Sequence, residues 1–171
     1  MLLGVGAAGG VDLGVGDGAF DGGLFAFDIT GKIVNKVPNL KRPNNVDLRY
    51  GFVLNGQNID IAALTERETN KVKLYSLPEL KEVGEFSVFD GEQQRSPMGI
   101  SLYKNPETQE IYAIVGRKTG PSGSYLWQYK LVEKEGKITG ELVRKFGNFN
   151  GGKEIESIAV DDALGYIYYS D

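Results

Sequence analysis

The stretch "VDLRYGFVLNGQNIDIAAL", residues 46–64, carries apolar residues in alternation on both sides of an Asn55-Gly56 pair. These two residues accept the positive backbone angles of a two-residue turn, so the stretch predicts a β-hairpin. Comparable pairs of apolar runs recur at residues 24–37, 72–88, 99–116, 124–146 and 156–171. Each of these segments is expected to form a further pair of antiparallel strands.

The hairpins recur in a fixed order. Superposing the copies brings Leu48, Ile100 and Ile158 to one position, with separations of 52 (100 − 48) and 58 (158 − 100) residues. Each complete copy has four antiparallel strands and no convincing helix, as in the blade of a β-propeller. An immunoglobulin-like sandwich also contains short strands, but it has no four-strand period. The sequence therefore predicts an all-β fold, a β-propeller fragment of about three blades.

The number of blades falls short of a closed propeller. Residues 24–171 supply the end of one blade, two whole blades and the start of another, whereas closure takes about 4 to 8. A partial propeller leaves strand edges and a blade face uncovered. We therefore expect the isolated chain to fold marginally or to associate.

A glycine-rich segment, residues 1–23, precedes this region and is expected to be a disordered or non-native start. Within it, "GVGAAG" at residues 4–9 matches the G-x-G-x-x-G pattern of dinucleotide sites. That motif lacks the strand before it and the helix after it. The acidic "DLGVGDG" at residues 12–18 resembles a calcium loop without the closing glutamate. Neither motif predicts a site.

The composition excludes several kinds of chemistry. The 171 residues include 41% hydrophobic residues, enough for a core, and neither cysteine nor histidine. Cysteine nucleophiles, Ser-His-Asp triads and histidine-based zinc sites are therefore excluded. The 23 acids and 19 bases are scattered without a basic stripe, so no nucleic-acid partner is expected. No signal peptide and no membrane span is visible either.

Charged and polar residues gather where the predicted innermost strands begin. The loops that lead into those strands, and the loops that follow each blade's second strand, open at the same end because antiparallel strands alternate in direction. These loops carry Asn44, Asn45, Asp47, Arg67, Met98, Arg117, Lys118 and Glu156. Carboxylates suit a hard cation such as calcium, and guanidinium or ammonium groups suit phosphate. The alternative is that Asp47 and Arg49 form a structural pair and that Arg67 and Lys118 are solvated loop charges.

One motif in this region points to a known family. "NNVDLRYGF", residues 44–52, closely resembles the N-N-V-D-(I/V/L)-R-Y signature of the β-propeller phytases. The similarity continues through "LNGQNIDIAALTER", "GISLY", "IYAIVG" and "IESIAVDDALGYIY" and covers residues 22–171. The resemblance implies a six-bladed propeller that uses calcium to hydrolyse phytate, myo-inositol hexakisphosphate, as a 3-phytase does. Other inositol phosphates are further candidate substrates, and the family implies a secreted or periplasmic location.

The resemblance also implies roles for individual residues. A metal-bound water is expected to attack phosphorus, so no side chain is identified as a nucleophile. Arg67 and Lys118 match phosphate-binding positions of the family, and Glu156 matches a calcium ligand. Together with the loop positions, the assignment is phosphate binding by Arg67, Lys118, Arg49 and Arg117, calcium binding by Glu156 and Asp47, and support by Asn44, Asn45 and Met98. Arg49 is alternatively assigned to local structure within the signature.

The sequence departs from the family pattern at several positions. Met98 replaces a tyrosine, and Phe20 and Asp21 stand where a basic pair is expected before "GGL". Further acidic ligands are expected beyond Asp171, so the chain is predicted to be incomplete. The alternative to an enzyme is a non-catalytic propeller fragment or a module that binds phosphate ligands or proteins.

Overall fold

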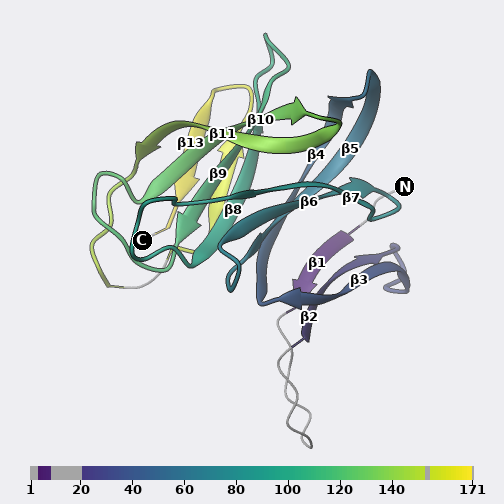
Figure 1. Cartoon of the computed structure of the whole chain (residues 1–171), viewed down its shortest axis with the longest axis horizontal. Helices are drawn as coiled ribbons and strands as arrows, with labels where there is room; N and C mark the ends of the chain where they lie inside the picture. Colours follow the sequence, from purple (N-terminus) through teal and green to yellow (C-terminus); the bar gives the residue numbers. More distant parts are fainter. Residues whose placement is uncertain (1–3, 9–20, 153–154, 171) are drawn as a thin grey trace, which may run out of the picture.

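The computed structural model describes residues 4–8, 21–152 and 155–170, which form strands and loops without a helix (Figure 1). Within this described part, no helix is therefore long and apolar enough to span a membrane. The strands are β1 (Gly4–Ala8), β2 (Asp21–Phe27), β3 (Ile33–Lys41), β4 (Pro43–Leu54), β5 (Gln57–Glu66), β6 (Lys71–Leu77), β7 (Glu82–Ser87), β8 (Pro97–Lys104), β9 (Ile111–Arg117), β10 (Leu126–Lys134), β11 (Lys137–Phe146), β12 (Ile158–Asp161) and β13 (Tyr166–Tyr169).

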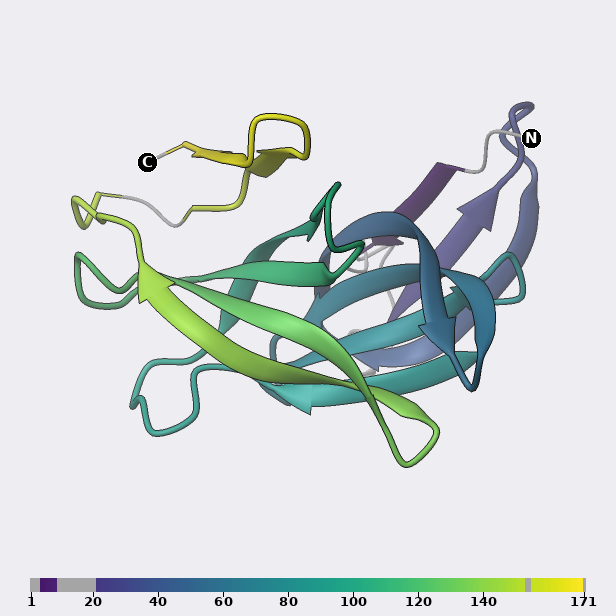
Figure 2. The ribbon, with the colours of Figure 1, turned by 90° about the horizontal axis from the view of Figure 1, so that it is seen from above.

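The strands form repeated units. β4 to β7 pair consecutively as one four-stranded antiparallel unit, and β8 to β11 form a second. One parallel backbone pair, Gly84 with Ile138, joins their outer strands β7 and β11, so that β4 and β8 are the edges of an eight-stranded sheet. Sheet β1–β3 precedes these units, and hairpin β12–β13 follows them. Figure 2 shows these two smaller sheets on opposite sides of the eight-stranded one.

Three apolar cores lie between the successive strand groups β1–β3, β4–β7, β8–β11 and β12–β13. This stacking confirms the propeller-like architecture predicted from the repeat. The core between the two complete units contains Phe52, Leu74, Leu102 and Trp127 among others. A second core lies between β2–β3 and the first unit, and a third between the second unit and β12–β13. Each complete unit is thus covered on both faces, as stacked propeller blades are.

Strand β5 illustrates how the sequence pattern produces this stacking. Ile61 and Ala63 belong to the core between the two complete units, whereas Leu64 belongs to the core shared with β2–β3. Successive side chains of a strand point to opposite faces, so a run of apolar residues covers both. The Asn55-Gly56 turn is confirmed, with φ angles of 51° and 73°, the positive values that this type of hairpin requires.

The first strand of the signature differs from the expected alternation. Strict alternation along this strand predicts that Leu48, Tyr50 and Phe52 share one face and pack within the blade, but Tyr50 is 66% exposed and Leu48 is half-buried. The register shifts between Arg49 and Phe52, which pair with Ile61 and Ile59, so β4 carries one extra residue at this point. Such a bulge reverses the alternation beyond it, and Tyr50 therefore faces outward.

The same pairing corrects the superposition of the repeats. Val46 pairs with Leu64 two residues before the end of β5, and Ile100 pairs with Val115 two residues before the end of β9. The residue equivalent to Ile100 is therefore Val46 and not Leu48. The shift of two residues (48 − 46) leaves the predicted face unchanged because strand side chains have a period of two.

Part of the glycine-rich start is described. Gly4–Ala8 form β1, which pairs antiparallel with β2, so most of the G-x-G-x-x-G motif lies in a strand. The acidic motif at residues 12–18 lies outside the described residues. That residues 1–23 are a disordered or non-native start therefore stays a prediction.

Glu110, beside the start of β9, provides a pH-dependent prediction. Lys130 Nζ lies 2.5 Å from its carboxylate, and the hydroxyls of Tyr112 and Thr108 donate to it. Lys130 and then Tyr112 lower the pKa of Glu110 from 4.5 to about 2. A lowered folded pKa stabilises the fold above the unfolded value and loses that contribution as the pH falls through the folded one. We expect an NMR titration of the Glu110 carboxyl to have its midpoint near 2, and Lys130→Met to raise it toward 4.5. A midpoint near 4.5 in the unsubstituted chain would contradict this.

Candidate functional site

The loops carrying Arg67 and Lys118 occupy equivalent places on the two complete units. The backbone N–H of Arg67 donates to the carbonyl of Arg42, and that of Lys118 donates to the carbonyl of Ser96, each at 3.0 Å. Each basic residue therefore follows the unit's second strand and lies beside the loop that leads into the first. Arg67 is half-buried and Lys118 is exposed. The structure thus places one cation on each unit at the same end of the strands, as predicted.

Side chains of the signature connect the starts of three innermost strands. Asn44 Nδ2 lies 3.6 Å from Met98 Sδ, and Asn45 Nδ2 donates to the carbonyl of Glu156 at 3.2 Å. Thr65 Oγ1 donates to the carbonyl of Met98 at 2.6 Å. The structure therefore brings Asn44, Asn45, Met98 and Glu156 together. Met98 is 1% exposed, so it fills the space between the units and does not face a ligand.

A cavity of about 420 Å³ lies between β4, β8 and the segment leading into β12. Its lining includes Asn45, Asp47, Arg49, Ser101 and Glu156. Polar and charged groups from the first complete unit (β4–β7), the second complete unit (β8–β11) and the β12–β13 hairpin, which we call the third unit, meet at this cavity. Both predicted calcium-binding carboxylates, Asp47 and Glu156, line this cavity.

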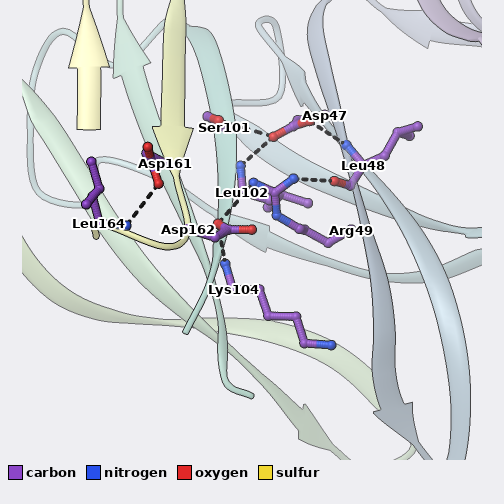
Figure 3. A network of polar contacts seen from close by, with 9 residues as sticks. All are labelled: Asp47, Leu48, Arg49, Ser101, Leu102, Lys104, Asp161, Asp162 and Leu164. Carbon is purple, nitrogen blue, oxygen red and sulfur yellow. Dashed lines mark hydrogen bonds and ion pairs between the residues drawn. The ribbon is translucent and has the colours of Figure 1, made fainter. Parts of the chain in front are cut away.

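Asp47 uses most of its hydrogen-bonding capacity within the protein. Its Oδ1 accepts the Leu48 N–H at 2.7 Å, and its Oδ2 accepts Ser101 Oγ–H at 3.1 Å and the Leu102 N–H at 2.7 Å (Figure 3). A carboxylate has about four lone-pair sites, so three donors leave little capacity for a cation. Asp47 joins β4 to β8.

Arg49 has a partner that the sequence did not suggest. Its Nη2 lies 3.3 Å from Asp162 Oδ1, and its Nη1 donates to the carbonyl of Leu48 at 3.0 Å. Asp162 also accepts the Lys104 N–H at 3.1 Å (Figure 3). The ion pair is therefore Arg49–Asp162 and not Arg49–Asp47. Two adjacent acids, Asp161 and Asp162, were the available sequence signal, but they do not indicate which strand they would meet.

Arg117 and Lys118 are neighbours with different surroundings. Arg117 is fully buried, its Nη1 lies 3.2 Å from Glu92 Oε2, and its guanidinium lies 4.8 Å from the centre of the Phe89 ring. Lys118 instead lines an open pocket of about 300 Å³ beside Arg95. The structure does not bring the guanidinium of Arg117 and the ammonium of Lys118 to one place. A buried, paired guanidinium is not presented to a phosphate.

The predicted calcium ligands form only part of a cation site. Glu156 is exposed and Asp47 is engaged by three protein donors. Calcium takes about six to eight oxygen ligands, and no group of three acidic, histidine or cysteine residues among the described ones is arranged to hold a metal. The described residues therefore do not fit a complete calcium site.

Two comparisons with known proteins agree with the signature. The family model described as Phytase matches residues 17–171. The 3-phytase of Bacillus subtilis (strain 168) is 33% identical over 156 residues, which cover 87% of this chain and 39% of that protein. The chain thus spans about two fifths of the length of the curated relative it matches.

Proposed function

Since the chain belongs to the phytase family, we propose that it forms part of an enzyme that hydrolyses phosphomonoester bonds of phytate. The reaction class is phosphoric monoester hydrolysis with water as the nucleophile. Other inositol phosphates carry the same charged groups and are proposed as further ligands. The given sequence contains neither cysteine nor histidine, so none of its own residues can form a phospho-cysteine or phospho-histidine intermediate.

The observation that carries the proposal is the equivalent placement of Arg67 and Lys118 on adjacent units. Both follow the second strand of a unit, and their backbones are anchored by the same type of hydrogen bond. Two cations on separate loops can bind two phosphate groups of one polyphosphorylated ring. A guanidinium binds phosphate through paired N–H groups, and an ammonium acts as a compact charge.

The remaining candidate residues differ in whether their charged groups are free to bind a ligand. Arg49 and Arg117 are each paired with a carboxylate, at 3.3 and 3.2 Å, so we leave them out of the proposed phosphate ligands. Calcium is the cofactor implied by the family resemblance, and Glu156 is the exposed carboxylate that we propose as one of its ligands. Because the described residues do not complete such a site, we assign no catalytic step to them through the ion.

Phytate binding to the 171-residue chain tests this proposal. Arg67→Ala and Lys118→Ala are each expected to weaken binding about tenfold in calorimetry, because each removes one charge-assisted contact. Lys36→Ala is the control because Lys36 is an exposed cation on β3. Equal affinities for the wild type and all three variants would contradict the proposal.

A second candidate function is phosphate binding without hydrolysis. The incomplete cation site of the described residues favours it. Phosphate release from phytate, measured with and without added calcium, separates the two candidates. Release that increases with calcium and falls in Arg67→Ala supports the enzyme, whereas tight binding without release supports the binding module.

A further inference from the structure

The inner strands β4 and β8 are the two edges of the eight-stranded sheet. Every second N–H of an edge strand points away from the sheet and needs another partner. On β8 these include the amides of Leu102 and Lys104, which lie two residues apart. Neither amide donates to a backbone carbonyl of a neighbouring unit. Both donate to aspartate side chains.

The two aspartates come from the units on either side of β8. Asp47 on β4 accepts the Leu102 N–H at 2.7 Å, and Asp162, directly after β12, accepts the Lys104 N–H at 3.1 Å. The free edge of the middle unit is therefore capped from both neighbours by carboxylates. A carboxylate that accepts backbone N–H groups makes a stronger hydrogen bond than a neutral acceptor.

Arg49 completes the connection between the outer two of these three units. Its guanidinium on β4 pairs with Asp162 at 3.3 Å, across 113 positions of sequence. The Asp162 carboxylate thus receives one donor from the first unit and one from the second. The side chains of Arg49 and Asp162 are 21% and 40% exposed. Solvent therefore partly screens the ion pair, and the pair contributes more by fixing the positions of the two strands than by its charge energy.

The same strand also holds the other end of β12. Asn45 donates to the carbonyl of Glu156 at 3.2 Å, just before β12 begins, and Arg49 reaches Asp162 just after it ends. Asn45, Asp47 and Arg49 are separated by two residues each, and all three line the same cavity. One face of β4 therefore holds both ends of the first strand of the third unit.

We propose that Asp47, Arg49 and Asp162 are positioning residues that fix the main chain at Glu156 relative to Arg67 and Lys118. This role rests on the proposed function, in which Arg67 and Lys118 bind phosphate groups and Glu156 is a calcium ligand of the same site. In this arrangement the charged side chains of the signature, Asp47 and Arg49, contact neighbouring units and not the ligand. Loss of Arg49 or Asp162 releases the third unit, whereas loss of Asp47 separates β4 from β8.

Site-resolved amide hydrogen exchange of the full chain tests the connection directly. Asp47→Ala is expected to speed exchange at Leu102 at least tenfold, and Asp162→Ala to do so at Lys104. Arg49→Met removes the ion pair without changing Asp162 itself and is expected to speed exchange at residues 155–158. Amides of β5 and β6 stay protected in all three variants, which distinguishes a local release from general destabilisation.

Asp60→Asn is the matched control. Asp60 also accepts an edge-strand N–H, that of Gly51 at 3.0 Å, but it does so within a single unit. This variant should change exchange near Gly51 and leave Leu102, Lys104 and residues 155–158 unchanged. Wild-type exchange at Leu102 in Asp47→Ala and at Lys104 in Asp162→Ala would overturn the proposal.

Phytate affinity of the same variants tests the positioning role. Arg49→Met and Asp162→Ala are expected to raise the dissociation constant about tenfold, while Asp60→Asn leaves it unchanged. Unchanged affinity together with faster exchange would overturn positioning. If the wild type binds no phytate, the proposed function fails and positioning fails with it, but the exchange data still decide whether the three residues connect the units.

Discussion

Replacing Arg117 by methionine is expected to destabilise the chain by about 3 kcal/mol, because the carbonyls of Gln94 and Ser124 lose their guanidinium donors and Glu92 loses one of its two cationic partners. Arg117 is fully buried, it pairs with Glu92 at 3.2 Å, and its Nη2 donates to the carbonyl of Ser124 at 3.1 Å. Its guanidinium also lies over the ring of Phe89, with 4.8 Å to the centroid. Methionine fills similar space but supplies none of these polar contacts.

Lys118→Met is the matched substitution for this prediction. Lys118 is exposed, so the free energy of unfolding should change by no more than about 0.5 kcal/mol. Urea titration measures both changes. The effects on phytate affinity should be reversed. Lys118→Met is expected to lose affinity, whereas Arg117→Met that has folded is expected to bind phytate as the wild type does. A stable Arg117→Met variant that no longer binds phytate would contradict this and indicate that Arg117 is a phosphate ligand.

The arrangement of the sheets could be predicted because it depends on local patterns. The Asn55-Gly56 turn and the recurring apolar runs indicated the hairpins, and the repeat indicated their grouping into units. The bulge that turns Tyr50 outward could not be predicted in this way. One extra residue in a strand changes neither the composition nor the turn signals, yet it reverses the alternation beyond it.

The candidate site was predictable to a similar extent. Arg67 and Lys118 were predicted correctly to lie at one end of the units because hairpin geometry alone determines where those loops open. The partners of Arg49 and Arg117 depend on contacts between segments remote in sequence, for which no local pattern exists. Strand alternation could have indicated that Arg117 and Lys118 point to opposite faces, although not which of them is buried.

Gly99→Ala is expected to detach the third unit while the rest of the fold stays intact. A Cβ atom at Gly99 would lie 2.4 Å from the carbonyl oxygen of Glu156, 3.0 Å from its carbonyl carbon and 3.2 Å from Ile158 Cγ1. These atoms are mainly backbone and cannot move without shifting the whole segment. The φ of Gly99 is not in the left-handed region, so space and not conformation requires glycine here. We expect amides of β12 and β13 to exchange roughly 100-fold faster, about 2.7 kcal/mol of local stability.

Gly116→Ala is the control for this change because it faces the same unit at ordinary distances. A Cβ atom there would lie 3.4 Å from the carbonyl oxygen of Ile155 and 3.4 Å from Ile158 Cδ1. Its effect on β12 and β13 should therefore be small. If Gly99→Ala detaches the unit, the carbonyl of Glu156 leaves Asn45, and phytate affinity falls together with amide protection. Equal exchange in the two variants would mean that the segment before β12 is not held against Gly99, and the third unit would then depend on its apolar core alone.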